Sequence, residues 1–568
     1  MNKREMVSVV LSGEAGKGLK TVEAVLVKAL NLSGFNVFAT KEYMSRVRGG
    51  NNTVEIIVSS REHRAFLDRI DILVPLNKNA IYRLADRIDK HTVIIGSSEN
   101  VEEKYRNRGR FLEADFTKIA EEVGKKIYAN SVAAGVVAGI LGADSDALKK
   151  TVVGTFEKKG EKVADRNKEA VDRGYRRGRE LAEENDLDID IDPEDSIKQH
   201  LLLNGAEAVS LGAIAGGCNF ISSYPMSPST GVLVFLSQHA SEFGIVSEQA
   251  EDEISAVNMA IGAWYAGARA MVTTSGGGFA LMVEGLSLAA MVETPLVIHL
   301  AQRPGPATGF PTRTEQADLL FALRAGHGEF PRIMLSPGTL KDAFSLSRHA
   351  FNLADRFQVP VFILTDQYLI DTYYNLPDLD ISGAGAEKAI AKTKKDYRRY
   401  EITDDGISPR GVPGYGDGLV MVDSDEHDES GRITEDMDTR VDMVEKRLKK
   451  MDGIREAVIE PELVGADDYR TLVVGFGSTY HVVQQALAGL ESDGVSFLHL
   501  KQVFPMHPKV EKYLEKADLV VTVENNATAQ LGTLLAMETG RGQDQSILKY
   551  NGLPFYVEEI RDLLADIG

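Results

Sequence analysis

Residues 222–230 (SSYPMSPST) combine hydroxyl side chains with two prolines, directly before an apolar pattern of helical period. We expect Ser227 to be the N-cap of that helix and Pro228 to occupy its first position, where proline is tolerated. A cap of this kind brings a hydroxyl group and the positive end of a helix to one point, which suits a carboxylate. The simpler alternative is that Ser227 only caps the helix.

Residues 247–270 begin with acids and continue as a small, apolar segment that predicts a buried helix. The acids are Glu248, Glu251, Asp252 and Glu253. Acids in a first turn often only complement the helix dipole. A carboxyl group at the start of a buried helix is nevertheless a candidate for proton transfer.

A long loop at residues 302–319 (QRPGPATGFPTRTEQADL) carries Arg303 and Arg313 among three prolines. It comes after residues 273–282 (TTSGGGFALM), which are typical of a strand, a glycine turn and a helix. An isolated arginine in a loop is usually solvated, whereas an arginine in a stiff loop can bind a carboxylate in a bidentate manner. We therefore expect this loop to face an acidic ligand.

Residues 13–21 (GEAGKGLKT) match neither the Walker spacing nor the G-x-G-x-x-G spacing, which disfavours a P-loop NTPase. Small residues before a helix can still present backbone N–H groups to an anion, and a plain tight turn is the alternative. Nearby, Arg46 and Arg48 precede two glycines, so that loop could bind phosphate or a partner.

The elements that would position these side chains follow an α/β rhythm. Strand and helix patterns alternate over residues 5–100, 198–370 and 470–568, which predicts mainly parallel, helix-covered sheets. In such sheets ligands bind outside the carboxyl ends of the strands. An acidic stretch at 183–196 is typical of a linker, and residues 371–460 are irregular and polar.

The composition limits the classes of protein that fit. A length of 568 residues suggests about three domains, and the net charge of −20 argues against nucleic acid or an anionic membrane as the main partner. Cys218 is the only cysteine, so the chain can form no internal disulfide and no cysteine-ligated cluster. A signal-peptide pattern and an 18-residue apolar run are both missing from the sequence, so we expect a soluble, cytoplasmic protein.

Several segments together resemble the 2-oxoacid:ferredoxin oxidoreductases, which are thiamine-diphosphate enzymes. YPMSPST is similar to the family's proline-bracketed loop, and residues 251–298 are similar to its pyrimidine-binding helix and the strand, turn and helix that follow. QRPGPATGFPTRTEQADL, YEITDDGISPRGVPG, DEHDESGRITED and VENNATAQL resemble family segments in order. GEAGKGLKT and YMSRVRGGNN are similar to the family's separate γ subunit. The resemblance covers nearly the whole chain and implies a γ–α fusion of the 2-oxoglutarate:ferredoxin oxidoreductase type.

The fold that the resemblance implies is α/β with three domains and mainly parallel sheets. We expect a γ-type domain at residues 1–182, the acidic linker at 183–196, a thiamine pyrimidine-binding domain at 197–395, and a transketolase-C-like domain with a polar connecting segment at 396–568. A GDG tripeptide at 416–418 resembles half of the magnesium–diphosphate motif, but the asparagine pair of that motif is missing at the required distance. We therefore expect no metal site in this chain.

The resemblance also assigns roles to particular residues. Glu253 matches the catalytic glutamate that binds the aminopyrimidine ring, and Glu251 is the alternative. Ser227 and Arg313 match the groups that hold the substrate carboxylate and keto group, although the family usually has threonine where this chain has Ser227.

Further positions follow the same resemblance. Tyr224 and Pro225 belong to the cofactor-binding loop, and Arg46 and Arg48 would lie on the coenzyme A side. A second γ-carboxylate on the substrate would need another basic group, for which Arg303 is the candidate.

The implied reaction is CoA-dependent oxidative decarboxylation of a 2-oxoacid to acyl-CoA and CO₂, with reduction of ferredoxin, in a direction that the sequence leaves open. Overall likeness favours 2-oxoglutarate over pyruvate or branched-chain 2-oxoacids. The implied cofactors are thiamine diphosphate with Mg²⁺ and a [4Fe–4S] cluster, held largely by a β subunit in an (αβ)₂ heterotetramer. A non-catalytic CoA- or nucleotide-binding scaffold is the alternative of another class.

Overall fold

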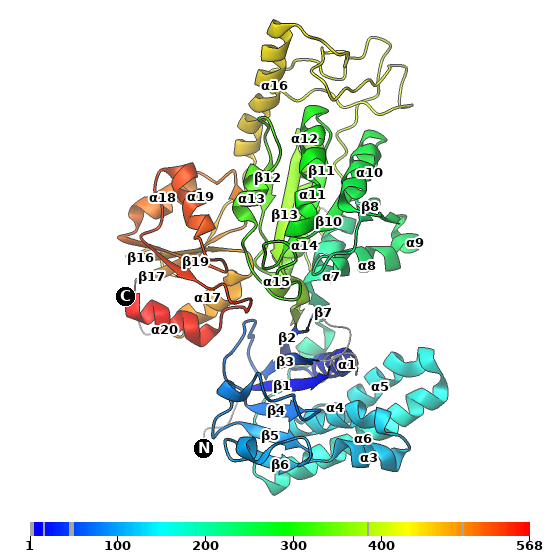
Figure 1. Ribbon diagram of the computed structural model, residues 1–568, viewed down its shortest axis with the longest axis vertical. Coiled ribbons are helices and arrows are strands. Elements are labelled where there is room, and N and C mark those ends of the chain that lie inside the picture. Colours follow the sequence, from blue (N-terminus) through cyan, green and yellow to red (C-terminus); the bar gives the residue numbers. More distant parts are fainter. Residues whose placement is uncertain are drawn as a thin grey trace. The chain divides into compact units, whose positions relative to one another are not determined.

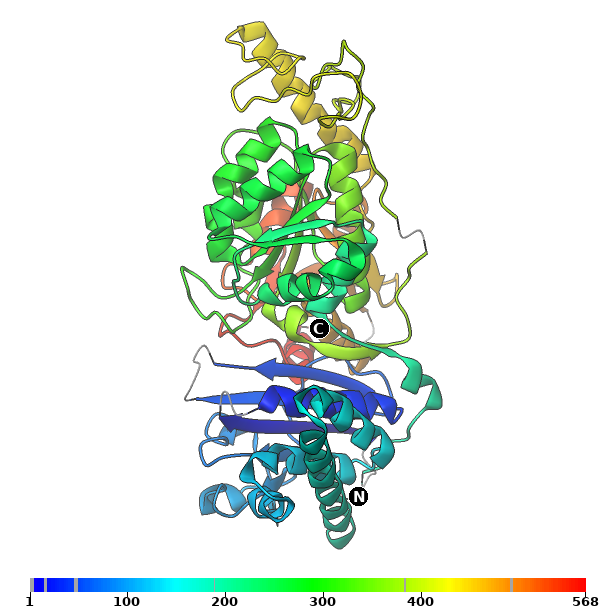
Figure 2. The ribbon, with the colours of Figure 1, turned by 90° about the vertical axis from the view of Figure 1, so that its right-hand side faces the viewer.

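The computed structural model describes residues 5–14, 18–44, 50–187, 189–382, 385–490 and 494–567. The chain divides into two compact units. The first comprises Met1–Leu203, Thr372–Asp378 and Tyr556–Glu558, and the second comprises Asn204–Asp371, Leu379–Phe555 and Glu559–Gly568. Figures 1 and 2 show the ribbon in two views.

The first unit is built on an eight-stranded sheet of order β6-β5-β4-β1-β3-β2-β14-β7. Its strands are β1 (Met6–Glu14), β2 (Asn36–Glu42), β3 (Asn51–Ser59), β4 (Ile72–Pro75), β5 (Val93–Gly96), β6 (Arg110–Glu113), β7 (Leu201–Asn204) and β14 (Tyr373–Leu376). Strands β1, β4, β5 and β6 pair in parallel. Strands β1, β3, β2 and β14 pair antiparallel in that order.

The α-helices that accompany this sheet in the described residues are α1 (Leu19–Leu32), α2 (Glu103–Arg106), α3 (Phe116–Val123), α4 (Ala129–Ile140), α5 (Ser145–Phe156) and α6 (Glu161–Glu184). Helix α1 is followed by Gly34, after the cap residue Ser33, at a φ of 92° that favours glycine. Helices α4 and α6 approach closely through glycines. A Cβ at Gly135 would lie 2.2 Å from the carbonyl oxygen of Val171, and one at Gly174 would lie 2.2 Å from that of Val132.

The second unit contains a seven-stranded sheet of order β18-β12-β13-β11-β10-β8-β9. Its strands are β8 (Phe220–Ser223), β9 (Val246–Gln249), β10 (Ala270–Thr274), β11 (Leu296–Gln302), β12 (Ile333–Leu335), β13 (Pro360–Asp366) and β18 (Gln502–Phe504). All neighbours pair in parallel except β12 and β18. The strands of residues 220–366 alternate with helices, as the α/β pattern of residues 198–370 predicts.

The helices that accompany this sheet in the described part of the chain are α7 (Gly205–Ala215), α8 (Thr230–Gln238), α9 (Ala240–Phe243), α10 (Glu253–Tyr265), α11 (Gly276–Leu281), α12 (Val283–Met291), α13 (Leu319–Arg324), α14 (Leu340–Phe357), α15 (Gln367–Asp371) and α16 (Met437–Glu456). Figure 1 shows α11 and α12 packed over the sheet, and α16 extending beyond the strand ends beside the irregular segment that precedes it. In that segment Gly416, the first residue of the GDG tripeptide, forms a β-bridge with Thr393 and has a φ of 114°.

The same unit contains a five-stranded sheet of order β15-β17-β16-β19-β20. It consists of β15 (Glu462–Val464), β16 (Thr471–Phe476), β17 (Val495–Leu500), β19 (Leu519–Glu524) and β20 (Gln545–Leu548), with helices α17 (Thr479–Ala488), α18 (Lys509–Lys516), α19 (Gln530–Thr539) and α20 (Val557–Ile567). The expectation of an α/β fold with three mainly parallel sheets is therefore confirmed. The domain limits drawn from the sequence stay a prediction. Within the described ranges, each helix is too short or too polar to cross a lipid bilayer.

Candidate active site

The candidate site lies at one edge of the seven-stranded sheet. Strands β8, β10 and β11 are neighbours and parallel, so the loops after their carboxyl ends meet at this edge. These loops are residues 224–229, the glycine turn that begins α11, and residues 303–318. They include the hydroxyl-rich, glycine-rich and arginine-bearing segments that the sequence singled out.

Glu253 is the first residue of α10 and is 3% exposed. Asp252 caps the helix, because its side chain accepts the backbone N–H of Ser255 at 2.8 Å. The Oε1 atom of Glu253 is buried without a hydrogen-bond partner among the described residues. Burial raises the pKa of the Glu253 carboxyl, and the neighbouring Asp252 carboxylate adds to the rise. An unsatisfied carboxyl oxygen of this kind can bind a ligand donor or carry a proton.

Residue 278, near the start of α11, has to be glycine because it packs directly against this carboxyl group. A Cβ atom at Gly278 would lie 2.4 Å from Oε1 of Glu253 and 2.3 Å from Oγ1 of Thr274. By contrast Glu251, the alternative candidate, is exposed. The geometry therefore favours Glu253 as the buried carboxyl group of the site.

The prediction that Ser227 is the N-cap of a helix with Pro228 at its first position is wrong. Helix α8 begins at Thr230, and the preceding Ser229 makes no side-chain cap. The Oγ atom of Ser229 instead donates to the carbonyl oxygen of Met226 at 2.7 Å, which fixes the loop as a turn. The turn leaves Ser227 partly exposed beside Tyr224, which is 41% exposed, and Pro225.

The arginine that the structure places against this turn is Arg303. Its Nη1 atom donates to the carbonyl oxygen of Ser227 at 2.7 Å, and its Nε atom is buried without a partner among the described residues. Burial lowers the pKa of Arg303, and Asp318 opposes that change. Arg303 therefore has donor capacity left for an anionic ligand.

Asp318 is a site residue that the sequence analysis missed. Its backbone N–H donates to Oε1 of Gln302 at 3.0 Å, while its Oδ2 atom is buried without a partner among the described residues. A Cβ at Gly276 would lie 2.3 Å from that oxygen. Burial raises the pKa of Asp318 to about 6, against the effect of Arg303. In the sequence, this carboxyl group is indicated only by its place in the EQAD segment at the end of the arginine-bearing loop.

Arg313 lies farther along the same loop, on the side of the five-stranded sheet. A Cβ at Gly552 would lie 3.1 Å from the Cβ of Arg313, and the N–H of Thr314 donates to the carbonyl oxygen of Gly552 at 3.2 Å. Arg313 is partly exposed. Next to it, burial raises the pKa of Glu315 to about 7, and the charge of Asp318 adds to the rise.

Gln316 fastens the loop to the five-stranded sheet. Its side chain donates to the carbonyl oxygen of Phe476 at 2.9 Å and accepts the N–H of Asn525 at 3.0 Å. Its own N–H donates to the carbonyl oxygen of Asn525 at 2.7 Å. Gln530 adds a bond to the carbonyl oxygen of Ala317 at 2.8 Å. Asn525 thus helps to position this loop.

Three further predictions from the sequence concern the arginine loop at residues 46–48, the single cysteine and the absence of a metal site. Arg46 and Arg48 lie outside the described residues. Cys218 is buried, and burial raises the pKa of its thiol to about 12, as expected for an inert thiol. Within the described ranges, the side chains of His, Cys, Asp and Glu do not gather in groups of three or more that could hold a metal ion.

Comparisons with known proteins agree on one family. Residues 211–446 match the model of the thiamine-diphosphate-binding domain of pyruvate flavodoxin/ferredoxin oxidoreductase, and residues 8–177 match the model named pyruvate ferredoxin/flavodoxin oxidoreductase. A 2-oxoacid:ferredoxin oxidoreductase subunit alpha from Sulfolobus sp is 32% identical over 99% of this chain and 96% of its own length. The 2-oxoglutarate synthase subunit KorA of Archaeoglobus fulgidus is 35% identical over 57% of this chain and 88% of its own.

A solved structure is similar over the full length. It is the 2-oxoglutarate:ferredoxin oxidoreductase from Magnetococcus marinus with 2-oxoglutarate, coenzyme A and succinyl-CoA bound. The match has a TM-score of 0.91 at 29% identity, and it covers 99% of this chain and 100% of the other.

Proposed function

This chain belongs to the 2-oxoacid:ferredoxin oxidoreductase family, as an alpha subunit, and we propose that it forms the substrate-side half of an enzyme acting on 2-oxoglutarate. The enzyme would convert 2-oxoglutarate, coenzyme A and oxidised ferredoxin to succinyl-CoA, CO₂ and reduced ferredoxin. Two electrons would leave the substrate and pass singly to two ferredoxins, and the thiol proton of coenzyme A would be released. The same reaction on pyruvate or a branched-chain 2-oxoacid is the alternative.

The observation that carries the proposal is the buried, unsatisfied Oε1 atom of Glu253 facing the glycine turn of α11. These residues fit the aminopyrimidine side of thiamine diphosphate, because a carboxyl group with a raised pKa can share a proton with a ring nitrogen. When bound, the cofactor would supply the carbanion chemistry that releases CO₂. Glu253 would orient the ring and hold the proton at its Oε1 atom.

The substrate would lie between the Ser227 turn and the loop at residues 303–318. Arg303 is supported as a carboxylate-binding residue by its burial, its contact with Ser227 and its free Nε atom. Ser227 and Arg313 would contact the substrate from the two ends of this region. Asp318 would set the position of Arg303 through its charge. Tyr224 and Pro225 would border the cofactor side of the turn.

The remaining cofactors are proposed to belong to a partner. One cysteine cannot ligate a [4Fe–4S] cluster, so a β subunit would supply the cluster together with the Mg²⁺–diphosphate site. The assembly would be an (αβ)₂ heterotetramer that passes electrons to ferredoxin, as the family resemblance implies. The loop with Arg46 and Arg48 would lie on the coenzyme A side.

The proposal is tested by co-expressing the chain with a cysteine-bearing partner and assaying CoA-dependent reduction of a viologen dye with each 2-oxoacid. The expected result is the highest kcat/KM with 2-oxoglutarate. A higher kcat/KM with pyruvate than with 2-oxoglutarate would assign pyruvate as the substrate. Binding of coenzyme A without turnover of any 2-oxoacid would support the non-catalytic scaffold.

A further inference from the structure

Helix α16 buries several cationic side chains and exposes several large apolar ones. Its buried residues include Lys446, Lys450 and Arg447, together with Met443 and Ile454. Its exposed residues include Met437 at 79%, Val441 at 54% and Leu448 at 40%, alongside charged residues. Buried cations and exposed large apolar side chains are both unusual on a surface helix.

The inward face of α16 is held by buried ion pairs. The Nζ atoms of Lys446 and Lys450 lie 2.7 Å and 2.6 Å from the two carboxylate oxygens of Glu293. Arg447 lies 2.9 Å from Glu426, which also pairs with Arg440. These contacts fix the rotation of the helix about its axis, so the outward position of the apolar side chains is set by the fold.

The outward side chains form a continuous stripe, which we call the α16 stripe: Met437, Val441, Val444, Leu448 and Met451. The steps between them are alternately four and three residues, which is the spacing of a coiled-coil seam. At 100° per residue they lie on one side of the helix, about 120° from the centre of the buried side. Val444 and Met451 are partly exposed.

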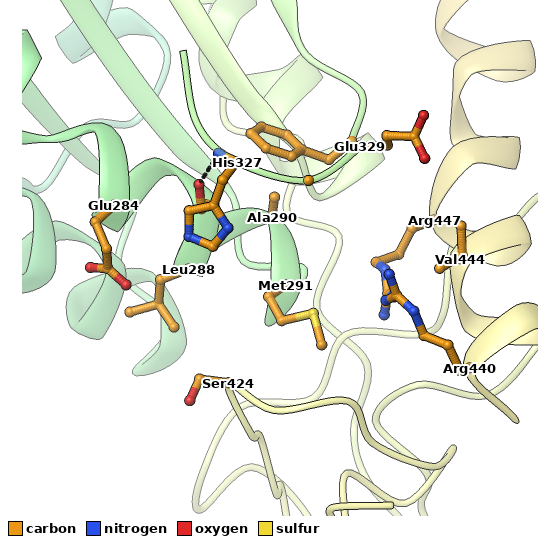
Figure 3. A pocket seen from close by; sticks show the side chains of 13 residues that line it. Glu284, Leu288, Ala290, Met291, His327, Glu329, Ser424, Arg440, Val444 and Arg447 are labelled. Atoms are coloured by element: carbon orange, nitrogen blue, oxygen red, sulfur yellow. Dashed lines mark hydrogen bonds between the residues drawn. The ribbon is translucent and has the colours of Figure 1, made fainter. Parts of the chain in front are cut away.

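A cavity of about 290 Å³ opens beside the stripe. Val444, Arg440 and Arg447 line it from α16, and Leu288 and Met291 line it from α12, on the opposite wall (Figure 3). The lining is therefore mixed, with polar residues such as His327 and Ser424 beside the apolar ones. Its apolar side, formed by Val444, Leu288 and Met291, can take one anchoring apolar side chain from a partner.

The charges along the stripe indicate which partner fits. Asp438, Glu445 and Asp452 are exposed and form an acidic edge along one side of it. On the other side, Arg440 and Arg447 are already paired with Glu426. If α16 of a second copy packed antiparallel on the stripe, the two acidic edges would face and repel each other. If it packed in parallel, the acidic edge of one copy would need Arg440 and Arg447 of the other as partners, and these arginines are already paired. A segment with lysine or arginine beside its apolar residues complements the edge.

We propose that the α16 stripe and the adjoining cavity form a docking surface for the partner subunit of the enzyme, through an apolar segment flanked by basic side chains. The inference rests on the proposed function for the existence of that subunit. The partner would cover the exposed apolar side chains and neutralise the acidic edge.

The test compares the affinity of the full chain for its co-expressed partner subunit in three variants, by sedimentation at low and high salt. V441D/L448D is expected to weaken binding by about tenfold or more, the usual effect of removing interface anchors. D438K/E445K/D452K is expected to weaken binding at low salt and to remove the salt dependence. The matched control, I381D, replaces another exposed side chain, Ile381 at 71%, and should leave the affinity unchanged.

Thermal unfolding of each isolated chain separates a docking defect from a folding defect. Affinities of both stripe variants equal to the wild type, or cross-links that join α16 to α16 of a second copy, would overturn the proposal. The binding measurement needs no turnover. If the wild-type complex forms through the stripe but oxidises no 2-oxoacid, only the proposed function fails.

Discussion

Gly278 lies directly against the carboxyl group of Glu253: a Cβ atom at Gly278 would stand 2.4 Å from Oε1. The two residues come from different elements, α11 and α10, which follow strands β10 and β9 of the same sheet. Because residue 278 has no side chain, the carboxyl oxygen is buried but remains able to bind a ligand. The site therefore depends on the absence of a side chain as much as on the presence of one.

The first prediction concerns this contact. G278A should displace the Glu253 carboxyl group by several tenths of an ångström or more and lower kcat roughly 100-fold, as expected for a misplaced catalytic group. The measurement is the steady-state rate of the co-expressed complex. G262A is the matched control, because a Cβ at Gly262 in α10 meets nothing within 4 Å. Equal rates for G278A and G262A would contradict the geometry.

The second prediction concerns the pH dependence of stability. Burial raises the pKa of Asp318 to about 6 in the folded chain, against about 3.9 in an unfolded chain. Between these values the folded state binds more protons, so the free energy of unfolding falls as pH rises from about 4 to about 6. D318N removes this loss and should stabilise the isolated chain more near neutral pH than near pH 4.

Chemical denaturation at the two pH values measures the effect. A D318N difference that is independent of pH would show that Asp318 does not titrate as described.

The third prediction concerns the link between the loop and the five-stranded sheet. Q316L leaves the N–H of Asn525 and the carbonyl oxygen of Phe476 without their side-chain partner. We expect a loss of about 2 kcal/mol in the free energy of unfolding, since an unsatisfied buried polar group costs about 1–3 kcal/mol. KM for the 2-oxoacid should rise as well, because the loop carries Arg303 and Arg313. Q238L, at an exposed position, should change neither quantity.

The sequence predicts the strands around the site better than the contacts within it. β8, β10 and β11 are short apolar runs bounded by glycine, serine or proline, so both their existence and the side of their loops could be predicted. The assignment of Glu253 to a buried position followed from the small, apolar helix after it.

The contacts that the sequence did not predict join distant residues or depend on local turn geometry. Arg303 reaches the carbonyl oxygen of Ser227 from 76 residues away, and no periodic pattern indicates that pairing. Ser227 lies three residues before the true start of α8, because the turn after Pro225 is longer than a simple cap. The alternation of strand and helix patterns also did not indicate that β2 and β3 pair antiparallel.

The rotation of α16 about its axis could be recognised only with the fold known. The sequence shows both an apolar seam and a charged seam along residues 437–456. Burial of Lys446 and Lys450 against Glu293 decides which of them faces inward.

The most direct test of the central claim is the rate of CoA-dependent viologen reduction with 2-oxoglutarate by the co-expressed complex, compared between the wild type and E253Q. The account predicts turnover by the wild type and a loss of roughly 10²–10⁴-fold in E253Q, the usual contribution of a proton-transfer group. The circular dichroism spectrum and the assembly state should be unchanged. Equal rates for the two proteins, or no turnover of any 2-oxoacid by the wild type, would contradict it.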